Sequence, residues 1–112
     1  MSDDDRRHAL RVPLDVPCLL TMQTQNGQEY PTLLTDISTG GVQLAVAPGI
    51  SLKTLINIRV SLYGLPKGLN LLESCKGQIV WASDRYCGIR FDQQLNISIE
   101  EIVKLVDGAT TR

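Results

Sequence analysis

Short runs of alternating apolar and polar residues, separated by turn-forming residues, constrain the fold of this chain more than any other feature. Alternation with a period of two places every second side chain on the same face of an extended strand. Glycine, proline and asparagine break the pattern about every eight to twelve residues, which is typical of small antiparallel barrels. The sequence therefore predicts an all-β fold, a small antiparallel β-barrel of six or seven short strands.

The first runs predict a β-hairpin. A strand that begins at Val12 would carry its apolar residues on one face, and Pro13 and Pro17 restrict it to an edge or a strand start. Gln25-Asn26-Gly27-Gln28 would form a tight turn, because Asn-Gly accepts a positive φ. The alternating apolar residues of this first strand are Val16, Cys18, Leu20 and Met22. The return strand is expected over residues 29–35.

The later runs predict the remaining strands. Strands are expected over residues 42–46, 54–62 and 86–91. Residues 69–83 read as one long strand or two short ones, with Gly77 as a bend or a bulge. Asp84 and Arg85 would make the last tight turn before the closing strand.

The C-terminal segment has a different pattern. Ser98 and Glu101 have the spacing of a capping box, in which the serine hydroxyl accepts from the glutamate amide. Apolar residues at helical spacing then continue towards Gly108, a residue type that often follows a helix end. The sequence predicts a short amphipathic C-terminal helix over about residues 98–107 that packs on the barrel.

Composition limits the class of protein. The chain has 112 residues, which suits one domain, with 12–112 as barrel and helix and 1–11 as a flexible arginine-rich arm. The net charge of −1 excludes a general binder of nucleic acid polymers. The three widely spaced cysteines suit a reducing compartment and small core residues. The acidic N-terminus and the lack of a long apolar run predict a cytoplasmic protein with no direct membrane insertion.

Two stretches carry the chemistry of a binding site. Arg6, Arg7 and Arg11 are three guanidiniums in six residues, and guanidinium forks suit phosphates and guanine edges. Asp36 and Ser38 precede the pair Gly40-Gly41, and glycines let another molecule approach the backbone. A carboxylate complements the guanine edge that offers only N–H donors. Together the two stretches predict a receptor for an anionic guanine nucleotide. Taken singly, the arginines could be a solvated tail, and Asp36 and Ser38 could be turn formers.

These residues carry a resemblance to a known family. Arg7-x-x-x-Arg11 followed by Asp36-x-Ser38-x-x-Gly41 resembles the paired signature of PilZ domains, which are bacterial receptors for cyclic di-GMP. The layout is also similar, since an arginine arm precedes a barrel that contains Val80-Trp81 and a Gly-Ile-Arg-Phe closing strand. The resemblance implies a six-stranded antiparallel β-barrel of the PilZ type with a short C-terminal helix. The resemblance covers essentially the whole chain and implies a stand-alone PilZ protein.

The resemblance implies a role for each site residue. Arg7 and Arg11 would hold the phosphates and the O6/N7 edges of guanine, while Asp36 would accept from the guanine N1 and N2 donors. Ser38 would bond a phosphate or a ring amide, and Gly40 and Gly41 would allow close approach. Trp81 would either pack half in the core or lie at the rim beside a base. Arg6 is an additional guanidinium that favours a stacked pair of ligands.

The sequence predicts a receptor or adaptor that converts the level of cyclic di-GMP into altered contact with an unidentified downstream protein. The resemblance implies roles in motility, biofilm or polysaccharide control. The alternative is a PilZ-fold interaction module that binds no nucleotide. A barrel that binds single-stranded nucleic acid is disfavoured by the 4% aromatic content. No enzymatic activity, metal site or cofactor is expected, because the single histidine and the scattered carboxylates do not assemble a recognisable centre.

Overall fold

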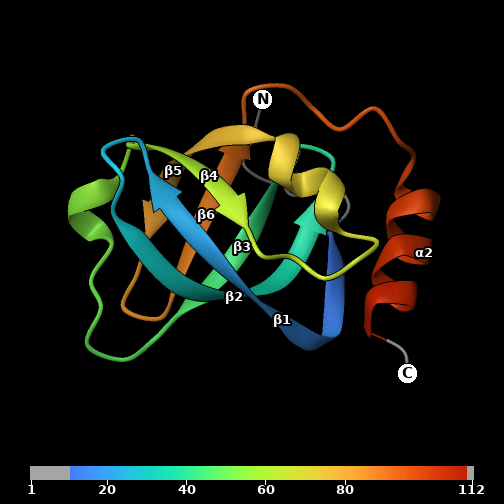
Figure 1. Cartoon of the computed structure of the whole chain (residues 1–112), viewed down its shortest axis with the longest axis horizontal. Coiled ribbons are helices and arrows are strands. Elements are labelled where there is room, and N and C mark those ends of the chain that lie inside the picture. Colours follow the sequence, from blue (N-terminus) through green and yellow to red (C-terminus); the bar gives the residue numbers. More distant parts are fainter. Residues whose placement is uncertain (1–10, 111–112) are drawn as a thin grey trace, which may run out of the picture.

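The computed structural model describes residues 11–110 and confirms the predicted six-stranded antiparallel barrel with one C-terminal helix (Figure 1). Of the predicted arm, only Arg11 is among the described residues. The strands are β1 (Val12–Thr24), β2 (Glu29–Ser38), β3 (Gly41–Val46), β4 (Arg59–Tyr63), β5 (Lys76–Ala82) and β6 (Tyr86–Phe91). The helical segments are the 3-10 helices η1 (Lys53–Leu55) and η2 (Asn70–Ser74) and the α-helix α2 (Ile99–Thr110).

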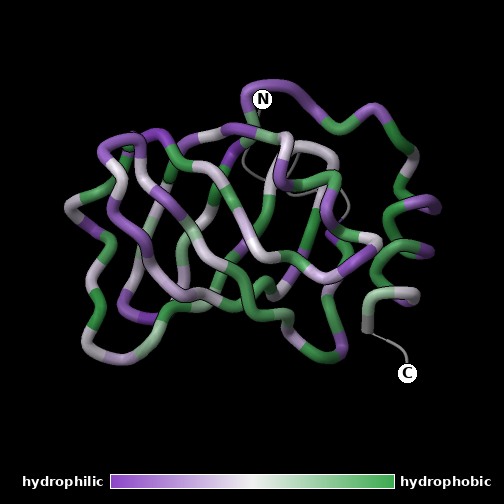
Figure 2. Tube along the Cα trace, in the orientation of Figure 1, coloured by the Kyte–Doolittle hydropathy of each residue, from purple (hydrophilic) through white to green (hydrophobic). Residues whose placement is uncertain are grey.

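The barrel closes in the order β1-β2-β3-β6-β5-β4, with β4 pairing back to β1. Buried apolar side chains from all six strands form one core. Hydrophobic residues are spread along the strands, with hydrophilic residues between them (Figure 2). The β1–β2 turn is the predicted one, since Gly27 has a φ of 91° and donates its N–H to the Thr24 carbonyl at 2.9 Å. The fully buried barrel side chains include Met22, Leu34, Leu44, Leu62 and Ile79.

The C-terminal helix packs against β1 and β2 through its buried residues Ile102 and Val106. Its polar residues face away from the barrel (Figure 2). The N-terminal cap is as predicted, because the Glu101 amide donates to the Ser98 hydroxyl at 3.2 Å. The helix continues past its predicted end at 107, since Gly108 does not adopt the positive φ of a helix-ending glycine.

The predicted strand over 54–62 is wrong in its first half. Residues Lys53–Leu55 form η1, and Asn57 takes a φ of 74°, a left-handed conformation that ends extended structure and that asparagine tolerates. Its amide still donates to the Ile79 carbonyl at 2.6 Å, so the segment stays attached to β5. The strand proper begins at Arg59.

The predicted strand over 69–83 is also shorter than expected. Its first part is η2, and β5 begins only at Lys76. The predicted bend or bulge at Gly77 is wrong, because the register of the β5–β6 pair shifts between Ile79 and Trp81 instead. Gly77 has a different role: a Cβ there would overlap the Arg90 carbonyl oxygen, so this glycine lets β5 approach β6.

One predicted core residue of β1 is exposed. Val16 has an exposed fraction of 59%, because the β1–β2 register shifts between Pro13 and Cys18. The shift changes which residues face inward, so that Val12 and Leu14 are buried on one side of it and Leu20 on the other.

The cysteines are free thiols. Cys87 is a core residue, and its burial raises the pKa of the thiol to about 12. Cys18 and Cys75 are half-buried and pack against the core. Within residues 11–110, no helix is long and apolar enough to cross a bilayer.

Candidate functional site

A hollow of about 290 Å³ lies on the outer face of the barrel across β2, β3, β6 and β5. It brings together every predicted site residue that the structure describes, whereas Arg6 and Arg7 lie outside the described residues. The predicted residues that line it are Arg11, Asp36, Ser38, Gly40, Gly41 and Trp81. The others are Val42, Gln43, Val80, Gly88, Ile89 and Arg90.

The β2–β3 turn is tighter than the sequence pattern suggests. Strand β2 continues to Ser38, beyond the predicted end at residue 35, so that only Thr39 and Gly40 connect it to β3. The Ser38 hydroxyl accepts from the Gly40 amide and donates to the Gly41 carbonyl, both at 3.3 Å. This hydroxyl therefore holds the turn itself together, whatever it contacts in a ligand.

Two register shifts shape the hollow. Thr35 is the extra residue in the β2–β3 pairing, where Asp36 lies opposite Gln43. Val80 is the extra residue in the β5–β6 pairing, where Trp81 lies opposite Gly88. β-bulges change the direction in which a strand presents its side chains.

The two bulges lie at the ends of one cross-strand row. Gln43 and Gly88 are partners in the middle of that row, and Asp36 and Trp81 lie at its two ends. The Thr35 hydroxyl donates to the Gln43 carbonyl at 3.0 Å and accepts from the Gln43 side-chain amide at 3.3 Å, which fixes the first bulge.

Asp36 is the acidic group of the hollow and is half-buried. Burial raises the pKa of its carboxyl above the ordinary value, and the nearby Arg11 guanidinium partly opposes this by favouring the charged form. No hydrogen bond from another residue of 11–110 occupies the carboxylate oxygens, so none of these residues competes for them with a ligand donor. An anion and a cation thus lie side by side at one end of the hollow.

The glycines of the hollow have structural reasons of their own. A Cβ at Gly41 would overlap the carbonyl oxygen of Ile89, so glycine is needed for β3 to approach β6. A Cβ at Gly88 would overlap the indole of Trp81, so glycine allows this ring to lie on the sheet. Gly40, in contrast, has open space where a Cβ would be. Of the two predicted glycines, only Gly40 has room next to its Cα, at the Cβ position, for an atom of another molecule.

Arg90 and Gln43 are the polar lining residues that the sequence prediction missed. Arg90 is exposed and lies opposite Gly41 in the β3–β6 register. Its outward direction could be read from the alternation of residues 86–91, in which the neighbouring Ile89 and Phe91 are buried. Its place beside Gly41 could not, because the sequence does not reveal how β3 and β6 pair. With Arg11, it gives the hollow two described guanidiniums.

The described residues contain no cluster of histidine, cysteine, aspartate or glutamate side chains that could hold a metal ion. The chemistry of the hollow is instead that of recognition: two guanidiniums for anionic groups, one carboxylate for N–H donors and one indole face for a flat ring.

Comparison with known families assigns the chain. The family model of the PilZ domain matches residues 5–108, nearly the whole sequence, and the chain therefore belongs to the PilZ domain family. PilZ domains are receptor and adaptor modules associated with cyclic di-GMP and are not typically enzymes. A comparison with curated proteins returned no match.

We expect replacement of Gly41 by alanine to lower the free energy of unfolding by about 1–3 kcal/mol, because the new methyl group would force β3 away from β6. Gly40→Ala is the matched control and should change it by less than about 1 kcal/mol, since the site is open and its φ is not positive. Urea denaturation followed by circular dichroism measures both values. Equal losses in the two variants would contradict the proposed role of the close approach at Gly41.

Proposed function

We propose that this protein is a cytoplasmic receptor that binds cyclic di-GMP in the hollow across β2, β3, β6 and β5, and that it passes the signal to a downstream protein. The observation that carries the proposal is that all six predicted ligand residues in the described part of the chain line the same hollow. They come from the residue before β1, from β2 and the following turn, from the start of β3 and from β5, so their convergence depends on the fold.

The charges of the hollow complement those of the ligand. Cyclic di-GMP has two phosphates and two guanines. Arg11 and Arg90 would bind phosphates or guanine O6/N7 edges, and Arg6 and Arg7 would add to them from the N-terminal residues. Asp36 would accept from the N1 and N2 donors of one guanine. This pairing distinguishes guanine from adenine, which lacks that pair of donors.

Trp81 would provide the apolar contact for a base. Its side chain is 40% exposed and lies over Gly88 at the end of the hollow opposite to Asp36. A base held by Asp36 and a ring stacked on the indole would both lie along the row that the two bulges define. Ligand binding would change the charge and shape of this face, and the downstream protein would recognise the change.

A PilZ-fold module that binds no nucleotide remains the second candidate. The observation that favours it is that Ser38 and Gly41 both have roles inside the protein, in the turn and at the β3–β6 contact. These two motif residues would therefore be needed even without a ligand. Among residues 11–110, Arg11 and Asp36 have no comparable role in the barrel, and we explain them by binding.

Calorimetric titration with cyclic di-GMP, and with cyclic di-AMP as the comparison, tests the proposal. We expect saturable binding that is selective for the guanine ligand. Arg11→Ala should weaken it about tenfold or more, because a charge-assisted hydrogen bond contributes roughly 1.5–3 kcal/mol. Lys104→Ala, which removes an exposed cation of α2 away from the hollow, should leave the affinity unchanged. The stoichiometry would distinguish one ligand from a stacked pair.

Two results would contradict the proposal. Absence of binding heat and of any ligand-induced rise in the melting temperature would favour the second candidate. Equal affinities of Arg11→Ala and the unaltered protein would remove the guanidinium contact from the mechanism.

We expect the affinity for cyclic di-GMP to fall as the pH is lowered from about 7 towards the ordinary carboxyl range near 4. Binding by Asp36 requires the charged carboxylate, and burial raises the pKa of this group, so protonation competes with the ligand already above that range. Above the raised pKa the affinity should be constant. Titrations at several pH values measure this, and Asp36→Asn should bind more weakly and without that pH dependence. The same pH dependence in Asp36→Asn would assign it to another group.

Trp81 is the only tryptophan of the chain, so its fluorescence reports on the proposed base contact alone. We expect cyclic di-GMP to quench this fluorescence with the same midpoint as the calorimetric titration, because a stacked guanine contacts the indole face. Trp81→Leu should bind less tightly while keeping its fold. Calorimetric binding without any fluorescence change would place the bases away from Trp81.

A further inference from the structure

The outer face of the barrel carries a second row of side chains, beside the row that forms the nucleotide hollow. Leu19 of β1 is the cross-strand partner of Leu33, Leu33 is the partner of Ala45, and Ala45 is the partner of Tyr86. The row therefore runs across four neighbouring strands. We call these four residues the apolar row.

The apolar row is unusually exposed for its composition. Leu19 has an exposed fraction of 66%, and Leu33 and Tyr86 are each 40% exposed. The adjacent row of cross-strand partners, Tyr63, Thr21 and Pro31, carries no charge either. None of the four residues of the apolar row lines the nucleotide hollow, so the proposed ligand does not explain them. Contiguous apolar surface of this kind marks an interaction site.

A hollow lies at each end of the apolar row. Leu19 lines a hollow of about 300 Å³, together with Pro17 and with Ala109 of α2. Ala45 and Tyr86 line the other, of about 500 Å³, together with Arg85. The row thus offers an apolar strip between two recesses that could each accept an anchoring side chain.

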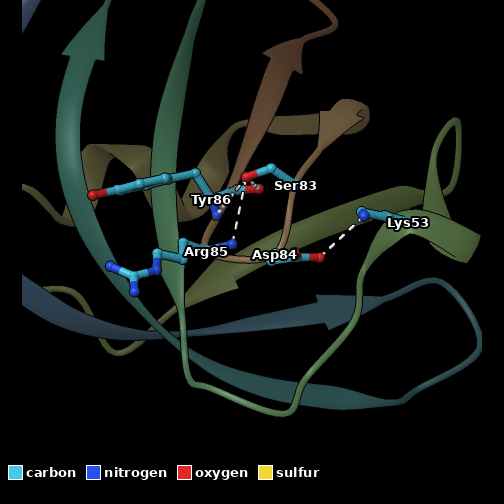
Figure 3. Close-up of polar contacts among 5 residues, drawn as sticks. All are labelled: Lys53, Ser83, Asp84, Arg85 and Tyr86. Atoms are coloured by element: carbon cyan, nitrogen blue, oxygen red, sulfur yellow. Dashed lines mark hydrogen bonds and ion pairs between the residues drawn. The ribbon is translucent and has the colours of Figure 1, made fainter.

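The β5–β6 turn holds Arg85 and Tyr86 in place at one end of the row. The Ser83 hydroxyl accepts from the Arg85 amide at 3.4 Å and from the Tyr86 amide at 3.1 Å (Figure 3). The Arg85 carbonyl accepts from the Val46 amide at 2.8 Å, which ties the turn to the end of β3. Such a preorganised turn loses little conformational freedom when a partner binds.

The two charged residues of this turn, Asp84 and Arg85, differ in their ion pairing. Asp84 points towards Lys53 and forms an ion pair with it at 3.0 Å, whereas Arg85 and Tyr86 project to the other side of the turn (Figure 3). Arg85 forms no ion pair with any residue of 11–110. Among the described residues, no carboxylate pairs with this guanidinium at the end of the apolar row. Arginine and tyrosine are residue types that often dominate the energy of protein interfaces.

We propose that the apolar row and Arg85 form a docking surface for a short acidic and apolar segment of a partner protein. Apolar side chains of the segment would cover Leu19, Leu33 and Tyr86, and a carboxylate next to them would pair with Arg85. The charge of Arg85 selects for an acidic residue. Asp84 is the carboxylate that lines the same recess, and its ion pair with Lys53 reduces its attraction for a basic residue.

The size of the surface argues for a partner segment and against a stable dimer of this chain. A stable interface buries about 800 Å² on each partner. Three side chains that are 40% to 66% exposed supply much less, since even a whole aromatic side chain contributes only about 150–250 Å². A short segment in a transient complex fits this area.

This inference adds a docking surface to the adaptor role proposed above, but it rests on the apolar row and not on nucleotide binding. The test therefore uses the full chain without nucleotide. The probe is a synthetic peptide with leucine and phenylalanine next to two glutamates, and the control peptide has lysines in place of the glutamates. Amide shifts of the isotope-labelled protein measure binding.

We expect the acidic peptide to shift the amides of Leu19, Leu33, Arg85 and Tyr86, and the basic peptide to leave them unchanged. Leu33→Glu and Arg85→Glu should each weaken the acidic peptide about tenfold or more. Val103→Glu, which adds the same charge at an exposed apolar residue of α2, should have no effect. Because Arg85 lies in an exposed turn, its variant keeps the test valid if Leu33→Glu does not fold.

Several outcomes would overturn the proposal. These are the absence of shifts, shifts that map to other residues, and equal binding of the two peptides. Self-association in sedimentation experiments that Leu33→Glu abolishes would assign the surface to a second copy of this chain instead. Loss of cyclic di-GMP binding in a separate titration would leave the docking result unaffected, so the two proposals can fail independently.

Discussion

The close approach of β3 and β6 at Gly41 is the constraint on which the rest of the site depends. No side chain fits between this residue and the Ile89 carbonyl. The Phe91 amide donates to the Gly40 carbonyl at 2.8 Å, and the Leu95 amide donates to the Thr39 carbonyl at 2.7 Å, so the turn is fixed to the end of β6 and to the segment beyond it. This contact joins the first half of the chain to the second and brings Arg90 next to the turn.

The position of the site follows from this pairing together with the two bulges. Once Gly41 lies opposite Arg90, the register places Gln43 opposite Gly88. The bulges at Thr35 and Val80 then direct Asp36 and Trp81 to the two ends of that row. The recognition residues are therefore held by backbone hydrogen bonds of a closed barrel, which favours a preorganised site on a rigid scaffold.

Alternation and turn signals were enough to predict the barrel, the capping of α2 and the turn at Gly27, because these depend on local chemistry. The failures have a common cause. Residues 54–57 and 70–74 have apolar spacing that suits a strand, but a left-handed Asn57 and short 3-10 turns place those residues differently. Periodicity cannot distinguish these cases. Likewise, the motif predicted Asp36 and Ser38, whereas Arg90 and Gln43 depend on a register between strands distant in sequence.

The two rows share β3, where Gln43 belongs to the hollow and Ala45 to the apolar row. A packed, closed barrel does not bend easily, so movement of the sheet is a poor way to transmit a signal between the two rows. Direct charge effects are also weak. Arg85 and Arg90 are five positions apart in extended chain, about 17 Å, which exceeds the screening length of about 8–10 Å. Coupling between the proposed nucleotide site and the proposed docking surface would therefore be steric. In that mechanism the bound nucleotide would cover or uncover part of the apolar row.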